Sequence, residues 1–272
     1  MKKIIAWSTG GLFSLLALLL ATPALANHAW GSYHWSRSAS PLSLKLGDNV
    51  SASWDAHLAT ASTDWSTSLA LDTAIVSGNT NAARGRSTPK NCIPTVGRVE
   101  VCSASYGATG WLGIASVWAS GSHITQGSVK LNDTYFNSAK YNTPAWRRFV
   151  TCQEIGHTLG LDHQDESFNN ANLGSCMDYT SDPSGTIGKQ LGNEHPNAHD
   201  YDQLAAIYAH LDTTTSALSK ASSAGANTVD IDTSDPSQWG RAVRTSFDGR
   251  RSLYERELRG GQKIFTFVIW AE

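Results

Sequence analysis

The sequence predicts an α+β fold, and three observations lead to this prediction. Runs with the alternation of β-strands occupy much of the chain between residues 41 and 132. Two segments with helical spacing of apolar residues follow, one beginning near residue 144 and one near residue 199. More strand-like runs end the chain after residue 238. Strands and helices grouped in this way, rather than strictly alternating, are typical of α+β domains.

Residues 1–26 have the pattern of a secretory signal peptide. Lys2 and Lys3 give a positively charged start, an apolar run extends to residue 21, and an Ala-Leu-Ala sequence at residues 24–26 matches a signal-peptidase cleavage site. The alternative is an N-terminal membrane anchor, because the run nearly reaches the length that spans a bilayer. The well-placed cleavage site favours the signal peptide. We therefore expect a soluble mature protein that is secreted or periplasmic.

The composition of the exported part narrows the classes of partner. About 245 residues are enough for one well-packed domain with a small appendage. The formal net charge is −2 and no basic stripe is present, so neither nucleic acid nor an anionic membrane is an expected partner. The sequence does not indicate an oligomeric state.

All four cysteines, Cys92, Cys102, Cys152 and Cys176, lie in the exported part. An even count outside the cytosol indicates two disulfides. Three pairings are possible. We favour Cys92–Cys102, which closes a local loop, and Cys152–Cys176, which ties a helix to a later turn. A zinc–thiolate site is the alternative, but the sequence contains no Cys-x-x-Cys pair.

The elements are predicted in chain order from their patterns. In the first half they are a strand at 41–50, a helix at 51–65, a strand at 69–76, a surface loop at 77–96, and strands at 98–106, 111–118 and 123–132. The pattern Asn142-Thr143-Pro144 then begins a helix that Gly160 ends. The next predicted helix, 199–211, has an apolar face made of Leu204, Ile207, Tyr208 and Leu211.

The C-terminal part is predicted to be a linker followed by a small β tail. Residues 213–238 are rich in Ser, Thr, Ala and Gly, as linkers are. Residues 239–272 contain three strand-like runs separated by an Asp-Gly turn at 248–249 and a Gly-Gly turn at 260–261. Three strands are marginally stable alone. We therefore expect the tail to dock on the main domain, residues 27–212, or on a partner.

Residues 153–163, QEIGHTLGLDH, have the spacing of a zinc site with one change. Positions four apart on an α-helix differ by only about 40° around the axis, so Gln153 and His157 face the same way. Glu154 points about 100° away and is placed to hold a water beside the metal. Gly160 lets the chain leave the helix so that His163 returns as a third ligand.

This segment resembles the zinc-binding motif of the metzincin clan of zinc endopeptidases, with Gln153 where the family has its first histidine. The sequence SCMDY at residues 175–179 resembles the methionine turn of the clan, and residues 197–208 resemble the C-terminal helix of its matrixin branch. The resemblance covers roughly residues 30–211. It implies a zincin-like fold with a twisted mixed sheet, and a secreted zinc peptidase that acts on an extracellular protein or peptide.

By this resemblance, Gln153, His157 and His163 would hold zinc, and Glu154 would activate water. Met177 would form a hydrophobic floor below the metal, and Tyr179 would be an extra ligand or would stabilise the oxyanion. Strand 123–132 would pair with an extended substrate.

Gln153 is the departure from the family pattern. A glutamine oxygen is neutral and weakly basic, and it suits calcium better than zinc. Loss of a partner behind a metal ligand costs about 10–100-fold in affinity, so loss of a direct ligand should cost at least that. Because zinc binding in good sites is worth roughly 10–16 kcal/mol, a weakened site could still be occupied.

Each of these assignments has a structural alternative. Gln153 could be a buried amide that ties the helix to a neighbouring strand, and Tyr179 could be an ordinary core tyrosine. The domain would then be a binding module that has lost the metal, although the retained Glu154 argues against this. His195 or His199 could replace the missing ligand, but a surface loop position and a helix-start position account for them.

Asp165 and Glu166 could orient His163 or bind structural calcium. If they bind calcium, a third possible function besides the peptidase and the binding module is a calcium-stabilised adhesin. A solvated acidic loop is the simpler interpretation of these two residues. The histidines that lack ligand spacing are assigned no role: His28, His34, His57, His123 and His210.

Overall fold

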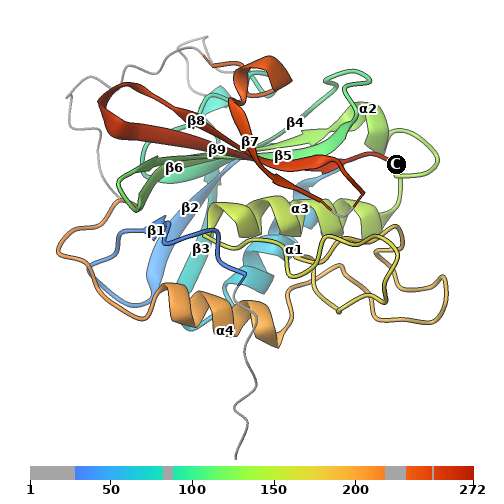
Figure 1. Ribbon diagram of the computed structural model, residues 1–272, viewed down its shortest axis with the longest axis horizontal. Helices are drawn as coiled ribbons and strands as arrows, with labels where there is room; N and C mark the ends of the chain where they lie inside the picture. Colours follow the sequence, from blue (N-terminus) through green and yellow to red (C-terminus); the bar gives the residue numbers. More distant parts are fainter. Residues whose placement is uncertain (1–27, 82–87, 218–230, 247) are drawn as a thin grey trace, which may run out of the picture.

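The computed structural model describes residues 28–81, 88–217, 231–246 and 248–272 (Figure 1). The proposed signal segment lies outside these ranges, as does much of the proposed linker. Within them, no helix is long and apolar enough to cross a bilayer. The described residues form a mixed β-sheet with a small number of helices, in agreement with the predicted α+β class.

Most of the sheet comes from the first part of the chain. Its parallel strands are β1 (His34–Trp35), β2 (Leu42–Asn49), β3 (Leu71–Ser77), β4 (Arg98–Ala104) and β6 (His123–Asn132). Strand β5 (Trp111–Ser120) runs antiparallel to β6. The strands predicted between residues 41 and 132 are all present within about two residues of their expected bounds.

The C-terminal strands extend the same sheet. They are β7 (Arg241–Thr245), β8 (Arg251–Glu257) and β9 (Gln262–Trp270), all antiparallel to their neighbours. The strand order is β3-β2-β4-β6-β5-β9-β8-β7, with β1 paired to β6. Strand β9 pairs with β5 along the whole length of β5 (Figure 1). The tail therefore docks on the main domain by backbone pairing.

Helix α3 (Pro144–Thr158) lies against the sheet below β5 and β9 (Figure 1). It begins at Thr143, whose hydroxyl accepts a hydrogen bond from the Trp146 N–H at 3.2 Å. Beside it packs α1 (Asp55–Trp65), where the Trp65 indole donates to the Cys152 carbonyl at 3.1 Å. Four short helical segments in the described part of the chain connect the strands: η1 (Asn79–Asn81), α2 (Asp133–Phe136), η2 (Pro236–Gln238) and η3 (Arg259–Gly261).

Helix α4 (Ala198–Ile207) lies below α3 in Figure 1, on the side away from the sheet. It ends four residues before its predicted bound. The prediction that Leu211 belongs to its apolar face is wrong, since Leu211 is 58 % exposed. Tyr208 ends the helix, and its hydroxyl donates to the Leu159 carbonyl at 2.9 Å. This contact holds Tyr208 in the core while the chain after it turns outward.

Both favoured disulfides, Cys92–Cys102 and Cys152–Cys176, are present. The first joins the loop after β3 to β4. The second connects the residue before Gln153 on α3 to the residue before Met177, so two parts of the sequence motifs are held together covalently.

Lys130 on β6 is a buried charge that gives the fold a pH dependence. Its side chain is 1 % exposed, and its ammonium donates to the Ser234 hydroxyl at 2.7 Å, with the Asp232 carboxylate 3.8 Å away. Burial lowers the pKa of Lys130 to about 8, and Asp232 offsets this only in part. Because the unfolded lysine titrates near 10.5, the folded state binds fewer protons between these two values. Its stability therefore rises as pH increases from about 8 to about 10.5, and the cost of the buried charge is fully present below pH 8.

We expect Lys130→Met to remove this pH dependence and to raise the free energy of unfolding at pH 7 by about 2–3 kcal/mol, because the apolar side chain needs no solvation. Urea unfolding at pH 7, 9 and 10.5 measures the effect. Lys140→Met, at a lysine whose side chain is 49 % exposed, is the control and should keep the wild-type slope. A Lys130→Met protein with the wild-type slope would contradict the prediction.

Candidate metal centre

The motif residues lie on α3 and in the turn that follows it. Gln153, Glu154 and His157 are 0 %, 0 % and 1 % exposed. Gly160 then reverses the chain with a φ of 104°, in the left-handed region that favours glycine. A Cβ at this position would lie 2.8 Å from the Tyr33 carbonyl oxygen, so space as well as conformation demands glycine.

The turn at Gly160 brings His163 back to His157. The two imidazole rings are perpendicular, with centroids 4.5 Å apart. His157 Nδ1 lies 2.9 Å from the Leu161 carbonyl, and His163 Nδ1 lies 2.8 Å from the Glu166 carboxylate. Oxygen acceptors at Nδ1 place the ring proton there, which leaves each Nε2 with the lone pair that binds metals. Burial lowers the pKa of His157 well below its usual value, and His163 adds to this, so His157 is neutral, as a ligand must be.

The two ends of the Gln153 amide differ. Its nitrogen donates to the Cys176 carbonyl at 2.9 Å, so the amide ties α3 to the turn that carries Met177 rather than to a strand. Its oxygen is buried and has no hydrogen-bond partner among the described residues. A buried acceptor left in this way costs about 1–3 kcal/mol. The oxygen is therefore the part of Gln153 that could bind a cation.

Glu154 is a buried carboxyl group that lies against β5. An ideal Cβ built on Gly113 of β5 would lie 2.7 Å from Glu154 Oε1, so the glycine makes room for this carboxyl group. Neither carboxyl oxygen has a well-formed hydrogen bond to a described residue. Burial raises the pKa of Glu154 well above its usual value, and the nearby backbone of Ala115 opposes this only in part. A carboxylate with a raised pKa is a stronger base than an ordinary one, as a proton acceptor in catalysis needs to be.

Met177 and Tyr179 flank these residues. Met177 is fully buried, and its sulfur lies 2.5 Å from where a Cβ on Gly156 of α3 would be. This close approach of the methionine to α3 explains the glycine at position 156. The Tyr179 ring packs against His163 with centroids 4.4 Å apart. Its hydroxyl donates to the Val268 carbonyl on β9 at 3.3 Å, so Tyr179 is engaged by the tail.

The C-terminal tail covers the candidate centre. The Phe267 ring of β9 stacks on His157, with centroids 4.2 Å apart and planes 10° apart. Arg244 of β7 forms an ion pair with Asp162 and lies 3.8 Å from Glu166. The covered surface is thus the one that contains the two histidines. Phe267 and Arg244 cannot be identified as site residues from sequence, because they lie in strands far along the chain and belong to no motif.

The predicted substrate strand is wrong. Strand β6 pairs with β4 on one side and with β5 on the other, so its backbone groups are already used by the sheet. The strand next to the motif helix is β5, and its second edge pairs with β9. A prediction from sequence could not foresee this, since it depends on the order of strands in space.

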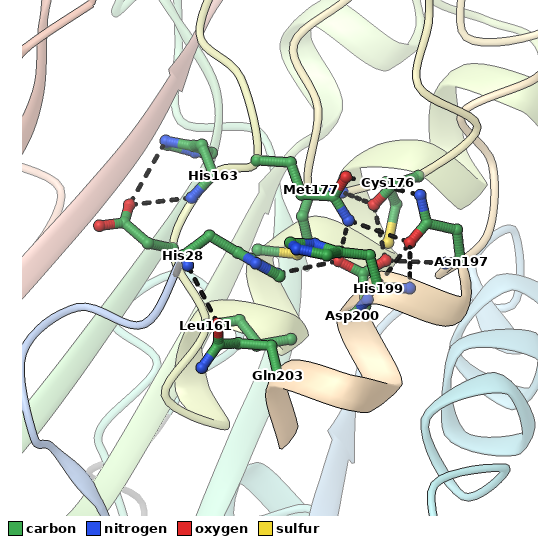
Figure 2. Close-up of polar contacts among 12 residues, drawn as sticks. His28, Leu161, His163, Cys176, Met177, Asn197, His199, Asp200 and Gln203 are labelled. Atoms are coloured by element: carbon green, nitrogen blue, oxygen red, sulfur yellow. Dashed lines mark hydrogen bonds and ion pairs between the residues drawn. The ribbon is translucent and has the colours of Figure 1, made fainter. Parts of the chain in front are cut away.

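A polar network lies below the Met177 turn and joins the start of the described chain to α4 (Figure 2). His28 Nε2 lies 3.1 Å from the Asp200 carboxylate, which also accepts from the Ser175 hydroxyl at 2.7 Å. The His28 backbone N–H donates to the Gln203 side chain at 3.1 Å. Asp200 therefore supports the turn of Met177 from beneath.

The two histidines considered as replacement ligands have other partners. His199 stacks on His28 with ring centroids 4.7 Å apart (Figure 2). His195 pairs with Asp64 at 2.7 Å, and its side chain is 49 % exposed. The helix-start and surface-loop interpretations account for both.

The acidic pair after His163 does not act as a unit. Glu166 accepts from the Ser252 hydroxyl at 3.0 Å in addition to holding His163. Burial raises the pKa of Glu166, but the hydrogen bond and charge of His163, the charge of Arg244 and the hydrogen bond from Ser252 together bring it below its usual value. Asp165 instead accepts from the Ser167 N–H at 2.6 Å. Glu166 thus orients His163, while Asp165 is engaged by the Ser167 backbone N–H.

Comparisons with known proteins do not assign the chain to a family. No protein family matches its sequence, and no curated protein matches it. Among solved structures it is similar to high choriolytic enzyme 1, a hatching enzyme zinc-protease from Oryzias latipes (medaka fish), with 13 % identity and a TM-score of 0.37 over 66 % of this chain and 96 % of that chain. It is also similar to myroilysin, with 13 % identity and a TM-score of 0.35 over 67 % of this chain and 98 % of that chain.

Proposed function

We propose that this protein is an exported zinc-dependent endopeptidase of zincin-like fold, whose substrate is an extracellular protein or peptide. The observation that carries this function is the meeting of the His157 and His163 rings, with centroids 4.5 Å apart, one helical turn after Gln153, whose side-chain oxygen has no hydrogen-bond partner among the described residues. Two neutral imidazoles are preferred zinc ligands, and a side-chain oxygen completes a three-ligand set of the kind that catalytic zinc sites use.

The chain's own residues supply the proton transfers that peptide hydrolysis needs. A zinc ion held by these ligands would act as a Lewis acid on water and on the scissile carbonyl. Glu154 would take the proton of the attacking water on its carboxylate and pass it to the leaving amine. The Tyr179 hydroxyl, once released from Val268, would donate to the oxyanion.

A substrate can reach these residues only when the tail has moved. With Phe267 stacked on His157, the chain as described is a closed form, and hydrolysis belongs to an open form in which β9 has left β5. An extended substrate would then pair with β5 in place of β9, as peptides add to exposed sheet edges. The substrate strand in this function is therefore β5, and not the strand 123–132.

The second candidate is a binding module without a metal. It is favoured by the bond from the Gln153 nitrogen to Cys176, which gives the glutamine a structural role. Glu154 argues against this module. A carboxyl group buried without a good hydrogen bond destabilises a fold, and a module that only binds a partner gains nothing from it.

Zinc content tests the proposed function before any substrate is known. We expect His157→Ala to hold about one zinc ion fewer per chain than the wild type, as measured by elemental mass spectrometry on the mature protein. His195→Ala, a histidine that pairs with Asp64 at the surface, is the matched control and should hold as much zinc as the wild type. Equal zinc in His157→Ala and wild type would favour the binding module.

Restoring a histidine at position 153 should strengthen the site. We expect Gln153→His to raise zinc affinity by at least about 10–100-fold, since imidazole is a far better zinc ligand than an amide oxygen. Competition with a chelator of known affinity measures the change. An unchanged affinity would mean that residue 153 does not contact the metal, and the Gln153→Ala affinity would then equal that of the wild type.

A further inference from the structure

A second group of metal-binding side chains lies at the edge of the fold, away from the candidate centre. It consists of His34, His123, His210 and Asp212, which we call the histidine–aspartate cluster. His123 Nε2 lies 3.3 Å from the Asp212 carboxylate, and His34 Nε2 lies 3.7 Å from it. His210 Nε2 lies 3.2 Å from His34 Nε2 and 3.7 Å from Asp212. His34, His123 and Asp212 offer ligand atoms that all lie within 4.8 Å of one another.

Three separate parts of the chain build this cluster. His34 and His123 are direct partners in the parallel pairing of β1 with β6. His210 and Asp212 come from the segment that leaves α4 and runs up the side of the sheet (Figure 1). Asp212 is fixed there by Arg37, whose N–H donates to its carboxylate at 2.9 Å and whose carbonyl accepts from its N–H at 2.7 Å. The residues of the cluster have no metal-ligand spacing in the sequence, so sequence alone gives His34, His123 and His210 no role.

The distances match those between ligands of one small metal ion. Zinc takes four ligands at about 2.0–2.2 Å in a tetrahedron, which puts neighbouring ligand atoms about 3.3 Å apart. Four separations in the cluster, from His210 to His34 and from each histidine to Asp212, run from 3.2 to 3.7 Å. His34 Nδ1 lies 2.8 Å from the Ser32 carbonyl, so its proton sits on Nδ1 and its Nε2 carries a lone pair. The lone pair of His34 Nε2 is therefore available to a metal ion in place of its contact with His210 Nε2.

We propose that the histidine–aspartate cluster binds a structural zinc ion through the Nε2 atoms of His34, His123 and His210 and the Asp212 carboxylate. A complete set of four protein ligands leaves no position for a substrate, which is the mark of a structural rather than a catalytic site. The ion would tie β1 and the start of β6 to the segment that follows α4. This site is independent of the candidate centre and does not require the chain to be a peptidase.

Zinc titration of the whole mature protein tests the site. The protein is stripped with a chelator, dialysed against zinc chloride and analysed for zinc content and melting temperature. We expect the double variant His123→Ala/His210→Ala to hold about one zinc ion fewer than the wild type, and to lose most of the rise in melting temperature that zinc produces. Both side chains are partly exposed, at 40 % and 54 %, so their loss should leave the fold intact.

Two further variants make the outcome specific. Asp212→Asn keeps an oxygen acceptor for the Arg37 N–H but removes the charge, and it should weaken zinc binding at least about tenfold. His195→Ala, at another exposed histidine paired with a carboxylate, should match the wild type. Equal zinc content and equal zinc-dependent melting in the wild type and the double variant would overturn the site and leave a hydrogen-bonded cluster. Loss of zinc in the double variant together with unchanged zinc in His157→Ala would instead support this site while refuting the candidate centre.

Discussion

Replacing Glu154 with glutamine should lower kcat/KM for peptide hydrolysis by about 10²–10⁴-fold, the range that loss of a general acid–base group produces. Glutamine has nearly the same shape as glutamate, so it should fit beside Gly113 without disturbing α3. Zinc content should stay at the wild-type level, because Glu154 is not among the proposed ligands. The loss of activity would then be a loss of proton transfer and not of metal.

The assay needs a protein whose tail is weakened, so both enzymes carry Phe267→Ala. A fluorogenic peptide library supplies the substrate. Glu194→Gln is the matched control, since Glu194 pairs with Arg148 of the same helix at the surface and should leave the rate unchanged. A Glu154→Gln enzyme as fast as its parent would refute the assigned role. No hydrolysis by the parent, even with Gln153→His added, would favour the binding module.

Weakening the tail should produce the second large effect, an increase in activity. Phe267→Ala removes the ring that covers His157, and truncations of this kind in buried sites cost about 3–5 kcal/mol. A loss of this size in the free energy that holds β9 against β5 would raise the population of the open form about 100-fold or more, since each 1.4 kcal/mol is a factor of ten. Peptide hydrolysis, and the rate at which a chelator removes zinc from the candidate centre, should both rise accordingly.

Arginine variants give a matched pair for the same test. Arg244→Gln breaks the ion pair with buried Asp162, and because Arg244 is itself 37 % exposed we expect about 1–2 kcal/mol, or about tenfold more open form. Arg241→Gln removes a neighbouring β7 arginine whose partner, Glu255, lies in the tail itself. In Arg241→Gln the chelator should remove zinc at close to the wild-type rate. Equal rates for the two variants, with Phe267→Ala also unchanged, would show that the tail does not control access.

The local features of the site follow from sequence, and the long-range ones do not. Short stretches of neighbouring residues determine the helix from Pro144, its cap at Thr143 and the turn at Gly160. These three features can therefore be predicted from sequence. Both disulfides were also predicted, because four cysteines allow few pairings. Phe267 reaches His157 only because β9 pairs with β5, and His34 meets Asp212 only through the path of the chain after α4. Contacts of this kind depend on the order of strands and segments in space, which composition and periodicity do not encode.

The pairing of β9 with β5 also decides how the molecule behaves toward its own copies. Strand β5 has 10 residues and is buried along almost its whole length, so without β9 it would present a long apolar edge. Such an edge is a template for pairing with other chains and for aggregation. With the tail in place the sheet ends instead at β7, which has 5 residues, two arginines and an irregular register. Short, charged and irregular edges resist intermolecular pairing. A chain without its tail would therefore expose the edge of β5 and would aggregate more readily.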